Sequence, residues 1–390
     1  MRVAVVSESF VPQVNGVTAS VCRILEHLAE GGHQATVIAP GAGPASYAGF
    51  PVHGTPAFRL PFYRSFHTGL PSGRVASLLA EFKPDIVHLA SPATVGAAGM
   101  SAAVRLGVPA VAVFQTDLAG FARRYGLRGA DGLIWSWLRH IHSRAARTLA
   151  PSTATMAELR ERRFPRLELW GRGVDLHRFD PGRRCERLRR ELAPNGEVIV
   201  GYVGRLAADK RVHLLAELTR LPGIRLVVVG DGPAARSLRR HLPTAVFCGL
   251  RVGDELGRIV ASFDVFVHTG VNETYCQAVQ EALAAGVPVV AAAAGGPLDL
   301  VQPGRNGLLY PPDAPALMRE AVARLAADEA ARGRMGEEAR RSVLGRTWAA
   351  VCGGLVEHYR AVLEEGDAWR AGAPRSPGSG AGMAGRRAAA

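Results

Sequence analysis

The stretch DVFVHTGVNETYCQAVQEALAAGVPVVAAAAGGP at residues 264–297 decides the fold, because it passes from an apolar strand through a helix to a second apolar strand. A strand, a crossover helix and a following strand form the repeating unit of a parallel α/β sheet. Glu273 and Glu281 both lie in this stretch, with the seven residues TYCQAVQ between them. This spacing predicts that Glu281 occupies the start of the helix while Glu273 lies in the loop before it.

Two basic residues upstream match this pair of carboxylates. Arg205 and Lys210 occur in VGRLAADK at residues 203–210, directly after a predicted strand. Taken alone, this spacing is typical of a solvated helix start. Cations that can hold a diphosphate, together with carboxylates that can hold sugar hydroxyls, form the set that a nucleotide-sugar enzyme needs.

The alternation of strands and helices extends over most of the 390 residues and occurs in two series. The first series begins with RVAVVS at residues 2–7, and the second begins with EVIVGYVG at residues 197–204. Between them, WGRGVDLHRFDPGR at residues 170–183 is rich in glycine, proline and charge, as interdomain linkers are. We therefore expect an α/β protein with two Rossmann-like, doubly wound domains that face a central cleft.

The expected boundaries follow from the two series. They are a first domain at 1–172, a second domain at 173–347, a helix at 348–366 that crosses back to the first domain, and a disordered tail at 367–390. The tail is predicted to be disordered because it contains glycine, alanine, proline and arginine without periodicity.

Composition excludes several classes of protein. No apolar stretch reaches the ~18–20 residues of a membrane span, and the N-terminal apolar segment is too short for a signal peptide, so we expect a cytoplasmic protein. Five scattered cysteines without a C-x-x-C pair indicate neither a disulfide framework nor a zinc site. The net charge of +13 suggests nucleic acid or an anionic membrane as partner, but no nucleic-acid-binding motif accompanies it. Attraction to lipid and a general arginine bias both remain open.

The combined motifs resemble those of family-4 retaining glycosyltransferases with the GT-B fold, up to about residue 366. They are the pair Arg205 and Lys210, VGDGP at 229–233, the pair Glu273 and Glu281, and GGP at 295–297. ESFVPQVNGV at 8–17 and FQTD at 114–117 are most similar to the GDP-mannose-dependent α-mannosyltransferases that act on lipid acceptors.

The resemblance implies a role for each matching residue. Arg205 and Lys210 would hold the donor diphosphate, Glu281 the ribose, and Glu273 the donor sugar. The full expected donor-binding set is Gly16, Gln115, Arg205, Lys210, Gly232, Pro233, Thr274, Tyr275, Cys276, Gln277 and Glu281. The expected catalytic residues are Arg205, Lys210, Glu273 and Asp117.

Three of these positions depart from the common family pattern. Thr274 and Cys276 stand where glycine is frequent, and Gln115 stands where histidine is frequent. Because glutamine does not titrate, any proton transfer would pass to Asp117 or to the leaving phosphate oxygen, as in a front-face retaining reaction. Asp117 has an equally good interpretation as a helix cap.

The chain has no D-x-D carboxylate pair at the end of a predicted strand, and the resemblance likewise implies a metal-independent reaction without a cofactor. In the first domain, Asn15 and Gly16 open a helix, and the start of a helix can bind an anion. The resemblance brings Gly16 close to the donor β-phosphate, whereas the simpler interpretation is a turn capped by Asn15.

The acceptor is expected on the first domain. Candidate contacts are the loop RLPFYRSFHTG at 59–69 and FARRYGLRG at 121–129, where basic and aromatic side chains alternate, namely Phe121, Arg123, Arg124, Tyr125 and Arg128. Such a composition suits a lipid or glycolipid acceptor at the inner face of the cell membrane. A UDP-sugar-dependent transferase acting on a lipid or a small polyol, and a sugar-nucleotide epimerase, remain alternatives. The other histidines are interpreted as structural.

Overall fold

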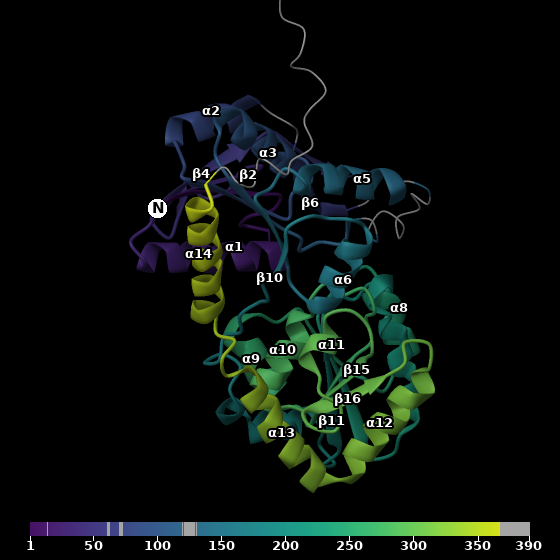
Figure 1. The fold of residues 1–390 in the computed structure, drawn as a ribbon. Helices are drawn as coiled ribbons and strands as arrows, with labels where there is room; N and C mark the ends of the chain where they lie inside the picture. Colours follow the sequence, from purple (N-terminus) through teal and green to yellow (C-terminus); the bar gives the residue numbers. More distant parts are fainter. Residues whose placement is uncertain are drawn as a thin grey trace, which may run out of the picture.

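The computed structural model describes residues 1–13, 15–60, 63–69, 73–118, 120, 129 and 131–366. Within these residues the chain forms two α/β domains, each with its own parallel sheet (Figure 1). The expected α/β class with two parallel-sheet domains is confirmed. The tail at 367–390 and the segment 121–128 lie outside the described residues.

The first domain contains an eight-stranded sheet in the order β10-β9-β8-β7-β1-β2-β4-β3. All neighbouring pairs are parallel except β3 and β4. The strands are β1 (Arg2–Ser7), β2 (Gln34–Pro40), β3 (Ser46–Tyr47), β4 (Phe50–Thr55), β7 (Ile86–Ala90), β8 (Ala110–Val113), β9 (Arg147–Ala150) and β10 (Leu167–Leu169).

The second domain contains a six-stranded, fully parallel sheet in the order β13-β12-β11-β14-β15-β16. The strands are β11 (Val198–Val203), β12 (Ile224–Val229), β13 (Val246–Gly249), β14 (Val265–His268), β15 (Val289–Ala292) and β16 (Gly307–Tyr310). The strand order reverses on either side of β1 in one sheet and of β11 in the other. Ligands of such sheets bind beyond the carboxyl ends of strands at these reversal points.

Helices pack on both faces of each sheet. In the first domain they are α1 (Gly16–Glu30), α2 (Gly73–Phe82), α3 (Val95–Leu106), α5 (Asp131–His142) and α6 (Thr153–Glu161). From the linker onward they are η1 (Pro181–Arg183), α7 (Glu186–Leu192), η2 (Ala208–Lys210), η3 (Val212–Arg220), α8 (Ala235–His241), α9 (Gly253–Ala261), α10 (Gln277–Ala284), α11 (Pro297–Leu300), α12 (Pro315–Ala327), α13 (Glu329–Val343) and α14 (Trp348–Glu364). No helix in these described ranges is long and apolar enough to cross a bilayer.

Helix α1 shows how the sequence determines this packing. Its residues Val21, Ile24, Leu25 and Leu28 are buried, and their spacing places them on one face of the helix. That face packs on the first sheet. The helix begins where the Asn15 side chain accepts hydrogen bonds from the next backbone N–H groups, at Val17 and Thr18, each at 3.0 Å. The sequence therefore sets both the direction in which α1 faces and the point where it starts.

Helix α14 joins the hydrophobic core of the first domain, although the second-domain sheet precedes it in the chain (Figure 1). Its buried residues include Cys352, Leu355 and Tyr359, and the Tyr359 hydroxyl lies 2.8 Å from Nδ1 of His88 in strand β7. The pair Gly353 and Gly354 lies on the less buried side of the helix, where the weak helix propensity of glycine does not disturb the packing.

The two chain crossings between the domains run side by side. Val174 N donates to Arg346 O at 2.9 Å, and Val174 forms a parallel bridge with Thr347. Gly173 lies so close to Trp348 that a Cβ at this position would be 2.5 Å from the Trp348 backbone. The linker between the domains is therefore tied to the segment that returns to the first domain.

One predicted acceptor segment has a different local structure. Residues 59–69 were expected to form a loop, but most of them belong to an antiparallel pair, β5 (Ala57–Leu60) and β6 (Tyr63–Gly69). The register shift at Arg59 and Leu60 obscures a strand pattern in this sequence. Gly69 packs under Val95, where a Cβ would come within 2.0 Å of the valine side chain.

Candidate active site

Three side chains from the second domain meet at the carboxyl ends of β11 and β14. Glu273 Oε1 lies 2.6 Å from Lys210 Nζ and 3.1 Å from His268 Nε2. Lys210 ends η2 in the loop after β11, His268 ends β14, and Glu273 lies between β14 and α10. The structure therefore brings together two of the residues predicted from sequence, Lys210 and Glu273, and adds His268 to them.

These three groups stabilise one another's charged forms. Burial alone would raise the pKa of Glu273, but Lys210 and His268 outweigh it and lower this pKa to about 2. Burial alone would lower the pKa of His268, but Cys276 and Glu273 raise it to about 10. The pKa of Lys210 is likewise raised, since Glu273 overcomes the effect of burial. The cluster holds one carboxylate between two cations.

Arg205 lies in the same loop as Lys210 and pairs with Asp209, with Nη2 at 2.8 Å from Oδ2. The VGDGP turn packs directly against this loop. A Cβ at Gly232 would lie 2.5 Å from Leu206 O, and Leu206 N donates to Asp231 O at 2.9 Å. Gly232 and the adjacent Pro233 therefore shape the backbone next to Arg205.

The loop that carries Glu273 is fixed by close backbone contacts with the GGP motif. Gly296 N donates to Glu273 O at 2.8 Å. A Cβ at Gly295 would lie 2.4 Å from Glu273 O, and one at Gly296 would lie 1.8 Å from Tyr275 O. The absence of a side chain at Gly295 and Gly296 therefore lets the backbone of the Glu273 loop come this close to the GGP motif.

Cys276 has φ +80°, in the left-handed region, immediately before α10. Glycine, the residue that the family resemblance leads us to expect at this position, adopts this conformation without strain. A cysteine here costs about 1–3 kcal/mol of local strain. Its side chain is buried and lies next to His268 and Glu273.

The first domain reaches the same loop through Gln115 and Thr155. Thr274 Oγ1 donates to Gln115 O at 3.1 Å, and Thr155 Oγ1 donates to Thr274 O at 3.1 Å. The side-chain amide of Gln115 is buried, and neither its oxygen nor its nitrogen has a hydrogen-bond partner within the described residues. A buried, unsatisfied amide is costly unless a ligand pairs with it.

Arg172 in the linker forms a second group with predicted site residues. Its guanidinium donates to Gly16 O and to Ser20 Oγ, and its carbonyl accepts from Tyr275 OH at 3.2 Å. A Cβ at Gly16 would lie 3.0 Å from Arg172 Nη1. This arrangement ties the start of α1 to the loop before α10.

Gln277 and Glu281 lie on helix α10 beside this group. Gln277 Nε2 donates to Gly173 O at 3.0 Å. Burial raises the pKa of Glu281 to about 7, while Gln277, Arg172 and Arg178 act in the opposite direction.

Glu281 does not start the helix, so that prediction was wrong. Helix α10 begins at Gln277, immediately after the left-handed residue Cys276, and Glu281 lies in its second turn. The expected start was too late because Cys276 is not a residue type that signals a helix start.

Asp117 makes a local contact. Its Oδ1 accepts from Gly120 N at 2.7 Å, as a helix cap would. The capping interpretation of Asp117 therefore describes an observed contact, and its catalytic role stays a prediction.

A group of potential metal ligands overlaps the cluster. Ligand atoms of His268, Glu273 and Cys276 lie within 4.8 Å of one another, although His268 is among the histidines that were expected to be structural. Glu273 Oε1 is already shared by Lys210 and His268. The observed contacts are those of a carboxylate that two hydrogen-bond donors share.

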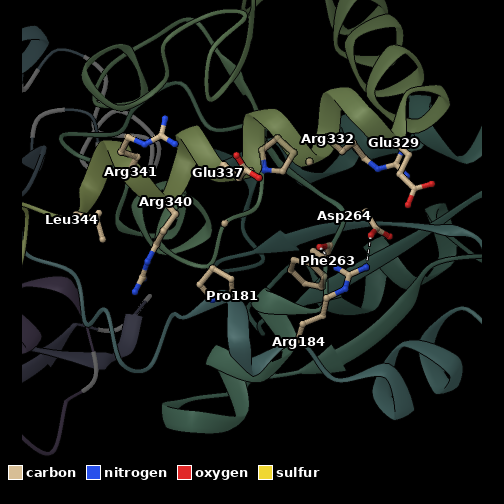
Figure 2. A pocket seen from close by; sticks show the side chains of 14 residues that line it. Pro181, Arg184, Phe263, Asp264, Glu329, Arg332, Glu337, Arg340, Arg341 and Leu344 are labelled. Carbon is tan, nitrogen blue, oxygen red and sulfur yellow. Dashed lines mark hydrogen bonds and ion pairs between the residues drawn. The ribbon is translucent and has the colours of Figure 1, made fainter.

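A cavity of about 580 Å³ lies elsewhere in the second domain, between α13, η1 and the residues that directly precede β14 and β15 (Figure 2). Its arginines already have structural partners. Arg184 pairs with Asp264 at 2.8 Å, Arg340 with Asp180 at 2.8 Å, and Arg332 donates to Leu325 O at 2.7 Å. None of the predicted site residues lines this cavity.

Sequence reasoning missed His268, Arg172 and Asp209. His268 was detectable as a polar residue at a strand end, and Arg172 as a cation within the glycine-rich linker. A further signal concerns Lys210. The chain has 47 basic residues, but only Lys83 and Lys210 are lysines.

Comparison with known proteins relates this geometry to a family. The model described as Glycosyltransferase Family 4 matches residues 14–178, and that of Glycosyl transferases group 1 matches residues 185–342. Proteins of Mycolicibacterium smegmatis and Mycobacterium tuberculosis, both named GDP-mannose-dependent alpha-mannosyltransferase, are 52% and 50% identical. Each match covers 93% of this chain and 98% or 97% of the relative.

More distant matches extend the comparison. A Mycobacterium tuberculosis protein named GDP-mannose-dependent alpha-(1-6)-phosphatidylinositol dimannoside mannosyltransferase is 28% identical, over 74% of this chain and 79% of that protein. Among solved structures, Anabaena HepE in complex with UDP has a TM-score of 0.76 at 19% identity, covering 93% of this chain and 100% of that chain. This structural similarity shows that the two proteins share a fold.

Proposed function

The chain belongs to glycosyltransferase family 4, and from this premise we propose that it transfers a mannosyl unit from GDP-mannose to a lipid or glycolipid acceptor. The reaction retains the anomeric configuration, needs no metal ion and takes place at a membrane surface. The observation that carries the proposal is the 50–52% identity to two proteins named for this donor and this transfer, over nearly their whole length.

Different residues of the site can bind different parts of the donor. Lys210 and Arg205 lie in one loop and can neutralise the leaving diphosphate, the role that a metal ion has in other transferases. Glu273 offers its carboxylate to the hydroxyls of the donor sugar. The unsatisfied amide of Gln115 provides a donor and an acceptor for the same sugar.

Two observations support a lipid acceptor. One is the relative named for phosphatidylinositol dimannoside, which is itself a lipid. The other is the net charge of +13, which favours anionic membrane surfaces.

Nucleotide chromatography tests the proposal. The purified chain is incubated with GDP-mannose or UDP-glucose in EDTA, with and without a bacterial lipid extract. We expect GDP to accumulate from GDP-mannose only when the extract is present. Release of UDP alone would identify a UDP-sugar, in place of GDP-mannose, as the donor. An isomerised nucleotide sugar formed without extract would indicate an epimerase. A requirement for added manganese would contradict metal independence.

Replacing Gly16 with valine is expected to abolish donor binding while the fold remains intact. A Cβ at this position would lie 3.0 Å from Arg172 Nη1, a contact that a shift of a few tenths of an ångström in the guanidinium relieves. The new side chain would occupy the start of α1, where the phosphate is proposed to approach. Calorimetric titration with GDP measures the effect. Gly73→Val is the matched control, because Gly73 also starts a helix and no atom of the described residues lies within 4 Å of a Cβ built there. A folded Gly16→Val variant with normal GDP affinity would exclude this phosphate contact.

GDP affinity is expected to rise with pH through about 7, because burial raises the pKa of Glu281 to about 7. Below this pH the carboxyl is protonated and loses acceptor capacity for the two ribose hydroxyls. The ionised fraction, and with it the Glu281 contribution to the association constant, increases about tenfold between pH 6 and pH 8. Titrations at several pH values, with Glu281→Gln as the reference, measure this contribution. If the wild type and Glu281→Gln showed the same pH dependence of GDP affinity, that dependence would come from another titrating group.

A further inference from the structure

Two side chains contact the Glu273 carboxylate, and in the proposed reaction one of them, Lys210, must also bind the donor diphosphate. Lys210 Nζ and His268 Nε2 both contact the same atom, Glu273 Oε1, at 2.6 and 3.1 Å. In the proposed function, which this inference rests on, Lys210 also neutralises the donor diphosphate. A diphosphate and Glu273 therefore compete for a single ammonium group.

Weakening the Lys210 contact would be costly for a carboxylate in this position. The Glu273 side chain is only 12% exposed, so it cannot rely on water. Removing one partner of a buried ion pair strongly destabilises the partner that stays behind when nothing replaces the lost contact. Glu273 therefore needs a second partner that stays in place while Lys210 turns to the phosphates.

His268 has the properties of that second partner, because its position is fixed independently of Lys210. It is the last residue of β14, its ring is stacked parallel to Tyr202 at 6.4 Å between ring centroids, and its carbonyl accepts from Tyr310 OH at 3.3 Å. Its side chain is 4% exposed. A buried ring held in this way cannot follow Lys210 away from Glu273.

Gly270 makes room for the contact between His268 and Glu273. A Cβ at Gly270 would lie 2.7 Å from Glu273 Oε1 and 2.9 Å from His268 Nε2, which is closer than real Cβ atoms approach. Any other residue at this position would push the two side chains apart. The local sequence is therefore built around this hydrogen bond.

The charged groups around His268 favour the same arrangement. Glu273 and Cys276 face the ring, and together they raise its pKa to about 10 against the effect of burial. Lys210 contacts Glu273 from the opposite loop. Because an ionised carboxylate can only accept a hydrogen bond, the 3.1 Å contact with Glu273 Oε1 places a proton on Nε2 of His268.

We infer that His268 is a positioning residue, which holds Glu273 against the donor sugar while Lys210 turns to the diphosphate. Both observed contacts are to Oε1, which leaves Oε2 of Glu273 for a sugar hydroxyl. His268 itself does not touch the donor.

The test compares His268→Leu, His268→Gln and Gly270→Ala with the wild type. Each protein is assayed for transfer from whichever donor the wild type uses and for GDP binding by calorimetry. We expect kcat to fall about 100-fold in His268→Leu, because a displaced Glu273 no longer orients the sugar. GDP affinity should stay within about twofold, because GDP lacks the sugar that Glu273 binds. His268→Gln, which keeps an N–H donor, should recover most of the rate, and Gly270→Ala should behave like His268→Leu.

Two further comparisons separate positioning from general packing. In a Glu273→Gln background, His268→Leu should have no additional effect on kcat, because its target is already altered. His142→Leu removes another buried histidine, at the end of α5, and should lower stability without lowering kcat.

The possible outcomes distinguish the inference from the proposed function. A normal kcat in folded His268→Leu, or an equal loss of kcat and GDP affinity, would overturn the inference and leave the function standing. Transfer from UDP-glucose alone would overturn the proposed donor, and the His268 comparison would be made with that substrate. Absence of transfer from every donor would overturn both.

Discussion

Replacing Glu273 with glutamine is expected to lower kcat about 10²–10³-fold, the effect of removing one preorganised electrostatic contact from an active site. Glutamine keeps the size of the side chain but removes the negative charge that Lys210 and His268 share. Lys210 then loses its buried counter-ion, so the free energy of unfolding should also fall by about 3 kcal/mol. Steady-state kinetics and denaturant unfolding measure the two effects.

Glu217→Gln is the matched control for this variant. Glu217 also forms an ion pair in the second domain, with Arg319 at 3.2 Å, but its side chain is 29% exposed. We expect normal kcat and little change in stability, because exposed pairs contribute about 0–1 kcal/mol. Comparable losses of kcat in the two variants would contradict a special role for Glu273.

Replacing Lys210 with methionine is expected to reduce kcat by a similar factor, about 10²–10³, through loss of the cation beside the leaving diphosphate. Methionine retains the length and apolar stem of lysine, and only the charge and its hydrogen bonds are lost. Lys210→Arg should recover part of the rate, because it restores the charge with a different geometry. Single-turnover kinetics measure the chemical step directly.

The chain provides an internal control, because its only other lysine, Lys83, is exposed and lies in the first domain. Lys83→Met should have normal activity. Amine-directed labelling of the wild type should modify Lys83 with or without GDP, whereas GDP should protect Lys210. Unchanged labelling of Lys210 at saturating GDP would argue against contact between Lys210 and the phosphates.

The fold was predictable because most of its elements carry local signals. The buried positions of α1, from Val21 to Leu28, repeat at helical spacing, and the apolar runs at 198–203 and 224–229 are buried parallel strands. The strands β5 and β6 were missed, since an antiparallel pair with a register shift gives no simple alternation.

The site was only partly predictable because its contacts join residues far apart in sequence. Lys210 and Glu273 could be identified from local motifs, but their contact across 63 positions depends on the neighbouring strands β11 and β14. His268 and Arg172 were missed because their partners are set by tertiary structure. The late placement of the α10 start had a local cause, the unusual left-handed conformation of Cys276.

The most direct test of the central claim is to measure whether label from GDP-mannose enters lipid. The wild type and Glu273→Gln are incubated in EDTA with a bacterial lipid extract and with labelled GDP-mannose or labelled UDP-glucose, and the lipid products are separated. The account predicts α-linked mannosyl lipid from GDP-mannose with the wild type and almost none with Glu273→Gln. Label in lipid from UDP-glucose alone, or equal product from the two proteins, would contradict it.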